Sequence, residues 1–115
     1  MVIKMFHNPR CSKSRATLAL LQEQGCEPDL RLYLESPPDA EELRSILKKL
    51  GKTARELMRK GESEYREQGL DNEALSEEEL IAAMLNTPKL IERPIVLANG
   101  RAAIGRPPES VLDIL

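Results

Sequence analysis

Apolar and polar residues alternate along this chain with periods that predict both strands and helices. Residues 2–7 form a short apolar run with β-branched members, as in a buried strand. Residues 12–24 place alanines and leucines at helical spacing and stop at Gly25, which predicts a helix with a glycine C-cap. Residues 29–33 predict a second strand, and such a strand–helix–strand unit has parallel strands. The alternating leucines of this second strand are Leu30, Leu32 and Leu34.

The middle of the chain carries helical patterns. Asp39 is the predicted N-cap of a helix that ends before Gly51, and residues 53–60 predict a further short helix. Residues 61–75 are polar and irregular, and Ser76 then opens a capping box in front of another helix. The apolar faces of the first and last of these helices comprise Leu43, Ile46, Leu47 and Leu50, and Leu80, Ile81, Met84 and Leu85.

The last part of the chain returns to strand patterns. Residues 94–98 and 101–104 predict two strands, with the hairpin signal Asn99-Gly100 between them, and residues 109–115 predict a short helix. This order predicts an α/β domain on the thioredoxin-like plan, a four-stranded mixed sheet with flanking helices. We expect a single domain over residues 1–115, with a helical insertion at about 37–90.

Composition narrows the possible functions only a little. A net charge of -2 over 115 residues gives no reason to expect nucleic acid or a membrane surface as a partner. The apolar runs are far shorter than the ~20 residues that span a bilayer, and we expect no secretory signal. Two cysteines make no disulfide framework and, with one histidine, no structural zinc pattern. We therefore expect a cytoplasmic protein without a metal.

Cys11 follows the first predicted strand and a turn, and stands at the start of the first predicted helix. The free N–H groups and positive dipole end of a helix stabilise a thiolate and can also hold an oxyanion. Three basic residues, Arg10, Lys13 and Arg15, add positive charge within one turn. A lone cysteine is more often a small buried apolar residue, but this context predicts a nucleophilic thiol.

Ser14 occupies the position where a dithiol redox protein carries its second cysteine. The chain lacks a resolving thiol there, so an external thiol has to complete a redox cycle. Cys26 lies beyond the end of the predicted helix, and we interpret it as structural or incidental.

The only histidine, His7, ends the first predicted strand. It could orient or deprotonate the Cys11 thiol, or it could simply be hydrogen-bonded to the following loop. The sequence favours neither role.

Three arginines are candidates for an oxyanion site. Arg93 directly precedes a predicted strand, Arg106 follows another, and Arg59 lies in the predicted helix at 53–60. Arginine binds tetrahedral oxyanions through a planar donor fork that lysine does not copy. Any single arginine is more often a solvated surface charge. The prediction therefore depends on Arg93 and Arg106 falling in turns that a thioredoxin-like sheet directs toward the helix start.

Five stretches, taken in order, cover nearly the whole chain with the motifs of one enzyme family. They are residues 7–15 (His-Asn-Pro-Arg-Cys-Ser-Lys-Ser-Arg), 33–38 (Tyr-Leu-Glu-Ser-Pro-Pro), 54–59 (Ala-Arg-Glu-Leu-Met-Arg), 92–96 (Glu-Arg-Pro-Ile-Val) and 104–109 (Ile-Gly-Arg-Pro-Pro-Glu). Through these motifs the chain resembles the glutaredoxin-dependent arsenate reductases, especially the short chromosomal members. Longer members carry a C-terminal extension beyond the position of Leu115, but the motifs precede it, and we expect activity to be retained.

The resemblance implies a reaction. Cys11 would attack arsenate and form a covalent thiolate–arsenate adduct. Glutathione, as co-substrate, would attack the adduct, arsenite would leave, and glutaredoxin would clear the resulting mixed disulfide. No bound cofactor is implied.

The resemblance also implies residue roles and one backbone feature. Arg59, Arg93 and Arg106 match the anion-binding arginines of the family. His7 matches the residue that tunes the cysteine, and Ser14 and Arg15 match its supporting contacts. The fold places a cis peptide bond between Arg93 and Pro94, whereas sequence alone favours the trans form of any X-Pro bond.

Three other functions fit part of the pattern. A monothiol glutaredoxin-like oxidoreductase explains Cys11 and the missing second cysteine, but it leaves the arginines without a shared role. Related regulators bind RNA polymerase without catalysis, typically through a Cys-x-x-Cys switch whose second position is Ser14 here. Low-molecular-weight phosphatases use a Cys-x5-Arg loop, and Arg15 comes too early for it.

Overall fold

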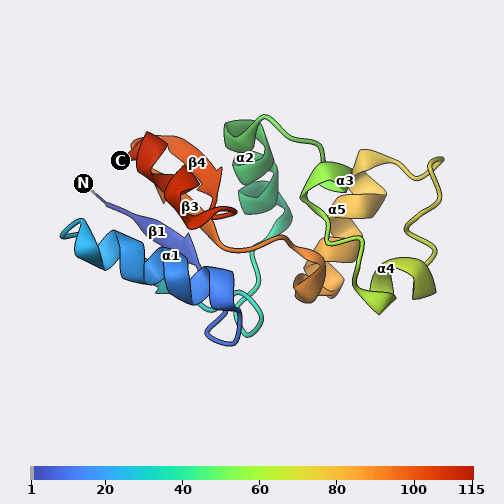
Figure 1. Ribbon diagram of the computed structural model, residues 1–115. Coiled ribbons are helices and arrows are strands. Elements are labelled where there is room, and N and C mark those ends of the chain that lie inside the picture. The colour runs from blue at the N-terminus through green and yellow to red at the C-terminus, as the bar shows by residue number, and fades with distance from the viewer. Residues whose placement is uncertain (1) are drawn as a thin grey trace. The chain divides into compact units, whose positions relative to one another are not determined.

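Residues 2–115 are described by a computed structural model, in which the chain forms two compact units (Figure 1). The sheet unit comprises the chain up to Ser36 and from Arg93 onward, and the helical unit comprises Pro37–Glu92. The helical unit spans the residues for which the sequence predicts an insertion. The expectation that residues 1–115 form a single domain stays a prediction.

The sheet unit contains a four-stranded mixed sheet, as predicted. Its strands are β1 (Lys4–Phe6), β2 (Asp29–Arg31), β3 (Ile95–Ala98) and β4 (Arg101–Ile104), in the spatial order β2-β1-β3-β4. β1 and β2 pair in parallel, whereas β3 is antiparallel to both β1 and β4. The parallel pair confirms the predicted strand–helix–strand unit, because parallel neighbours need a crossover between them.

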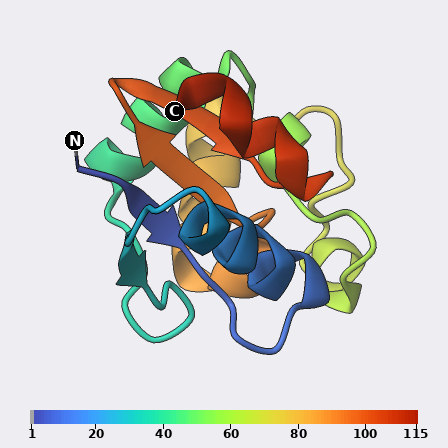
Figure 2. The same ribbon diagram turned by 60° about the vertical axis from the view of Figure 1, so that its left-hand side comes forward.

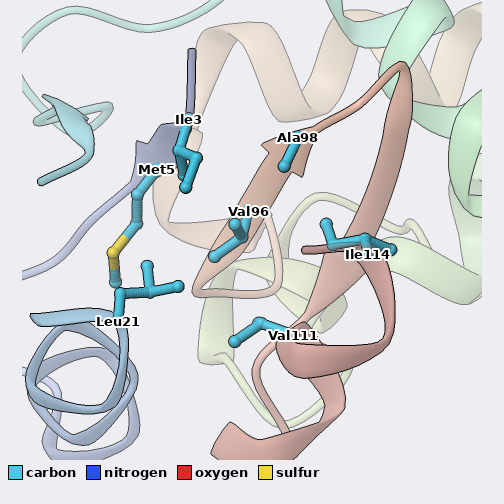
Figure 3. Close-up of a cluster of buried hydrophobic side chains, with 7 residues drawn as sticks. All are labelled: Ile3, Met5, Leu21, Val96, Ala98, Val111 and Ile114. Atoms are coloured by element: carbon cyan, nitrogen blue, oxygen red, sulfur yellow. The ribbon is translucent and has the colours of Figure 1, made fainter. Parts of the chain in front are cut away.

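The helices α1 (Ser12–Glu23) and η2 (Pro108–Ile114) cover one face of this sheet (Figure 2). The last helix, predicted at 109–115, is a 3-10 helix in the structure. Between the sheet and these two helices lies a cluster of buried apolar side chains (Figure 3), namely Ile3, Met5, Leu21, Val96, Ala98, Val111 and Ile114.

Gly25 ends α1 as predicted. The N–H of Gly25 donates to the carbonyl of Gln22 (3.0 Å), and the N–H of Cys26 donates to that of Leu21 (2.9 Å). This is a Schellman motif, which needs a left-handed residue, and Gly25 has a φ of 78°. The sharp stop sets the return of the chain toward β2.

The second predicted strand is shorter than expected, and its alternating leucines do not face the core. β2 ends at Arg31, and Leu30, Leu32 and Leu34 are all exposed. Tyr33 is buried instead, and its ring stacks on that of Phe6 with 6.3 Å between the centroids. The larger aromatic side chain takes the interior position, so the leucines that alternate with it face solvent.

The helical unit consists of α2 (Ala40–Leu50), α3 (Ala54–Leu57), α4 (Ser63–Glu67), α5 (Glu77–Asn86) and the 3-10 helix η1 (Pro88–Leu90). The caps agree with the prediction: Asp39 accepts the N–H of Glu42, and Ser76 forms a capping box with Glu79. In α2 and α5 the predicted apolar faces are buried, with Leu50 and Leu85 at their partly exposed margins.

Two expectations for this unit are corrected. The helix predicted at 53–60 stops at Leu57, because Met58 adopts an extended conformation and forms an isolated bridge with Ile91. The stretch 61–75 is not wholly irregular, since it contains α4. Within residues 2–115, no helix is long and apolar enough to cross a membrane.

Candidate active site around Cys11

Cys11 is the N-cap residue of α1 and is partly exposed. Its carbonyl accepts the N–H of Arg15 (3.0 Å), which starts the helix, and its own N–H donates to the carbonyl of Asn8 (3.0 Å). No side chain caps the helix at this position. The first-turn N–H groups of a helix have no intrahelical partner, so the thiol stands where these donors and the dipole favour negative charge.

The loop between β1 and α1 is held by a buried polar pair. The side chains of His7 and Ser14 are both almost completely buried, and His7 Nδ1 lies 2.6 Å from Ser14 Oγ. The same hydroxyl accepts the N–H of Asn8 at 3.0 Å. When His7 is the neutral Nε2–H tautomer, Ser14 donates to Nδ1, and the pair links the end of β1 to the first turn of α1.

Burial, and secondarily the positive charge of Arg15, lowers the pKa of His7 below its usual value of 6.5. The imidazole is therefore neutral near pH 7, which suits an acceptor for the Ser14 hydroxyl. Within residues 2–115, the His7 ring forms no hydrogen bond to Cys11 and is instead hydrogen-bonded to Ser14 on the helix. This partner lies on α1 and not in the loop, so both roles that the sequence left open for His7 stay predictions.

Arg15 supports the loop from the other side. Its Nη1 donates to the carbonyl of Pro9 at 2.9 Å, while Arg10 donates its backbone N–H to the side chain of Asn8 at 3.0 Å. These bonds fix the backbone that precedes Cys11. Asn8 takes part in three of the loop's hydrogen bonds, a role that its Asn-Pro turn signal alone did not reveal.

Arg106 lies against the sulfur of Cys11. Its Nη2 donates to Cys11 Sγ at 3.6 Å, and its Nε donates to the carbonyl of Arg93 at 2.8 Å. Arg106 thus reaches the start of α1, and its bond to the carbonyl of Arg93 brings the two turns together. The Arg93–Pro94 peptide bond is cis, which the resemblance implied, and the Arg106–Pro107 bond is cis as well.

A close backbone approach places the end of β4 against α1. A Cβ on Gly105 would lie 2.8 Å from Pro94 Cγ and still nearer to the Thr17 side chain. Thr17 is buried, and its Oγ1 lies 3.5 Å from the carbonyl of Gly105. Only a residue without Cβ fits here, so Gly105 and Thr17 set the position from which Arg106 reaches Cys11. Neither residue was predicted from the sequence to be part of the site.

Arg59 belongs to the helical unit and lies just after α3, on an extended segment and not on a helix as predicted. Its backbone N–H donates to the carbonyl of Leu90 at 2.7 Å. Its guanidinium is held by two carboxylates, with Nη1 at 3.0 Å from Glu62 Oε1 and Nε at 3.4 Å from Glu92 Oε1. The side chain is thereby oriented by two glutamates that were not predicted from the sequence to be part of the site.

Cys26 is partly exposed beyond the end of α1, where its thiol is 3.9 Å from the carbonyl of Gln24. It is not among the residues that surround Cys11. Within residues 2–115, no group of three or more His, Cys, Asp or Glu residues is arranged to hold a metal ion.

Known proteins resemble this chain over nearly its whole length. The model of the ArsC family matches residues 6–114. The chain is 61% identical over 114 residues to the uncharacterized protein YfgD of Escherichia coli (strain K12), which covers 98% of this chain and 96% of that protein. It is 53% identical over 114 residues to the arsenate reductase of Neisseria meningitidis serogroup B, with coverage of 98% and 97%.

Solved structures agree in fold. An arsenate reductase from Vibrio cholerae has a TM-score of 0.97 at 52% identity and covers 100% of this chain and 98% of its own. A putative arsenate reductase from Yersinia pestis has a TM-score of 0.94 at 52% identity, with coverage of 97% and 99%. The fold is thus thioredoxin-like, and the chain belongs to the ArsC family.

Proposed function

We propose that this protein is an arsenate reductase that uses Cys11 as its nucleophile. The thiolate attacks arsenic and displaces an oxygen ligand as water, which forms a Cys11–arsenate adduct. Glutathione then attacks, two electrons pass from the two thiols to arsenic(V), and arsenite leaves. Cys11 remains as a mixed disulfide with glutathione. Glutaredoxin reduces that disulfide and returns the free thiol.

The contact between Arg106 and Cys11 is the observation that carries this proposal. It places a guanidinium 3.6 Å from a sulfur that already stands at the start of α1. A thiolate and an incoming oxyanion are both negatively charged, so they repel one another unless cations and N–H donors lie between them. The helix start and Arg106 supply these groups at one point.

The predicted site residues other than Cys11 form two groups with different roles. Arg59, Arg93 and Arg106 bind the oxyanion, since a planar fork can donate two parallel bonds to arsenate oxygens. His7, Ser14 and Arg15 hold the loop around Cys11, a role supported by the bonds from Ser14 to His7 and from Arg15 to Pro9. This second group positions the nucleophile and does not touch the substrate.

Reduction needs thiols from outside the chain. Ser14 stands where a resolving cysteine would be, and it is buried and hydrogen-bonded to His7. Glutathione is the co-substrate and glutaredoxin the protein partner in our proposal, with no bound cofactor. Two free cysteines suit a reducing compartment, and we place the protein in the cytoplasm.

A coupled assay tests the proposal. Arsenate-dependent NADPH oxidation is measured with glutathione, glutathione reductase and glutaredoxin, and a parallel reaction replaces glutaredoxin with thioredoxin and its reductase. Cys11→Ser should abolish turnover, whereas the matched Cys26→Ser variant should retain it. No turnover in the unaltered protein, while Cys11 still reacts rapidly with an alkylating probe at pH 7, would reject arsenate reduction and favour a glutaredoxin-like activity.

A further inference from the structure

Three leucines stand exposed along one short segment at the edge of the sheet. The exposed fractions are 46% for Leu30, 38% for Leu32 and 44% for Leu34. β2 is an edge strand, so no further strand of residues 2–115 covers this side. A group of neighbouring exposed apolar side chains marks an interaction site, whereas single exposed apolar residues are ordinary.

Residues 32–36, which we call the leucine turn, are held rigidly. The carbonyl of Leu32 accepts the N–H groups of Glu35 (3.0 Å) and Ser36 (2.9 Å), and Arg31 Nε donates to the carbonyl of Ser36 (2.6 Å). Between the two exposed leucines, Tyr33 is only 1% exposed and stacks on Phe6. The turn therefore presents Leu32 and Leu34 in a fixed arrangement, which reduces the entropy lost on binding.

The leucine turn lies beside the loop that leads to Cys11. The N–H of His7 donates to the carbonyl of Arg31 at 2.9 Å, which joins the end of β1 to the start of the turn. A pocket of about 270 Å³ lies between the turn and this loop. Its lining comprises the four residues before Cys11 and three residues of the turn, namely His7, Asn8, Pro9, Arg10, Leu32, Leu34 and Glu35.

We infer that the leucine turn and this pocket form the docking surface for the protein reductase that regenerates Cys11. The inference rests on the proposed function, in which Cys11 ends each cycle as a mixed disulfide with glutathione. The partner's thiolate attacks the glutathione sulfur, the bond to Cys11 breaks, and Cys11 leaves as a thiolate. The partner now carries glutathione in a new mixed disulfide, so the exchange is balanced without any other reactant.

The chemistry of the surface fits a protein partner. Interfaces between proteins have an apolar centre and a charged rim. Here Pro9, Leu32 and Leu34 supply the centre, with Glu35 on the side of the turn and Arg10 on the side of Cys11. A complementary partner has an apolar patch beside its own thiol, with a basic residue facing Glu35 and an acidic one facing Arg10. A small tripeptide would instead need several placed polar groups and does not require a row of exposed leucines.

The test isolates the exchange step from arsenate. The Cys11–glutathione mixed disulfide is prepared in a Cys26→Ser background, and its reduction by purified dithiol glutaredoxin is followed beside reduction by dithiothreitol. We compare Leu32→Ser/Leu34→Ser and Glu35→Lys with Leu112→Ser, an equally exposed leucine (37%) on η2. The double variant should lower the rate constant with glutaredoxin about tenfold, because a few central residues dominate most interfaces. Glu35→Lys should also lower it, whereas dithiothreitol should not distinguish the variants.

Three results would overturn the inference. Equal glutaredoxin rates for the double variant and Leu112→Ser would exclude docking at the turn. A matching loss with dithiothreitol would mean that the turn only shapes the Cys11 loop. A matching loss with glutathione as the sole reductant would assign the pocket to the tripeptide. The exchange reaction contains no arsenate, so these results can be interpreted even if the protein does not reduce arsenate. The melting temperature of each variant checks that it is folded.

Discussion

Arg106 makes two contacts that a lysine could not make together. Its Nη2 lies against Cys11 Sγ and its Nε donates to the carbonyl of Arg93. The second bond fixes the plane of the guanidinium, so the first is made in one orientation. A lysine carries its charge on a single atom and would have to choose between the two acceptors.

At this scale we predict that Arg106→Ala slows alkylation of Cys11 by iodoacetamide at pH 7. A hydrogen bond to a charged group contributes about 1.5–3 kcal/mol, and this one is exposed to solvent, so we expect a decrease of about tenfold. The alkylation rate of Arg106→Lys should lie between that of the unaltered protein and that of Arg106→Ala. The control is Arg101→Ala, which removes an exposed arginine at the other end of β4. Equal rates for Arg106→Ala and Arg101→Ala would show that Arg106 does not activate the thiol.

His7 provides a prediction for stability against pH. Burial and Arg15 lower the pKa of His7 in the folded protein, so the unfolded chain binds a proton more readily. No stability is lost above the unfolded value of about 6.5. As the pH falls below it, the unfolded state gains the proton first and the free energy of unfolding decreases, until the folded pKa is passed. Urea titrations between pH 7.5 and 5 should show this decrease, and His7→Gln should show less of it.

At the scale of elements, the end of β4 meets the middle of α1 at Gly105, which contributes no side chain to the contact. Gly105 donates its N–H to the carbonyl of Pro94 (2.9 Å) and faces Thr17 on α1. This contact sets the distance between the helix that carries Cys11 and the turn that carries Arg106. A one-carbon change at Gly105 therefore acts on both the packing and the site.

We predict that Gly105→Ala destabilises the protein by about 1–3 kcal/mol, the usual cost of overpacking a close contact. It should also slow Cys11 alkylation, because the turn and Arg106 have to shift. The matched control is Gly61→Ala, since nothing lies within 4 Å of a Cβ at Gly61. Chemical denaturation measures both variants. A Gly105→Ala protein as stable as Gly61→Ala would contradict the close approach.

At the scale of the whole molecule, the residues of the proposed active site come from both units. The sheet unit holds Cys11, Arg93 and Arg106, and the helical unit holds Arg59. In the helical unit, the carboxylates of Glu62 and Glu92 hold Arg59, and Glu62 also pairs with Lys89 at 3.6 Å. Because Arg59 lies outside the unit that holds Cys11, its part in oxyanion binding should be separable by mutation from activation of the thiol.

We predict that Arg59→Ala raises the KM for arsenate about tenfold or more, in line with the loss of a charge-assisted bond, and leaves Cys11 alkylation unchanged. Arg44→Ala is the control, because Arg44 forms an exposed pair with Glu78 in the same unit. Such pairs contribute little, so its KM should stay within about twofold of the unaltered protein. If Arg59→Ala slowed alkylation as strongly as it raised KM, the proposed separation of roles would be wrong.

Much of this architecture could be predicted from the sequence because local signals act over a few residues. The stop at Gly25, the cap at Asp39, the capping box at Ser76 and the Asn99-Gly100 hairpin are all present in the structure. Each depends on hydrogen bonds or backbone angles within one turn of chain. Cys11 at the start of a helix follows from the same kind of signal.

Tertiary structure alone decided the features that depend on distant partners. Helical composition favoured 53–60 as one helix, but pairing of Met58 with Ile91 ends it at Leu57 and leaves Arg59 on an extended segment. Alternation alone does not reveal which side of a short strand faces the core, and the stacking of Tyr33 on Phe6 turned the leucines outward. Arg106 meets Cys11 across 95 positions in the chain, a contact that depends on the packing of Gly105 against Thr17 and on the bond from Arg106 to the carbonyl of Arg93.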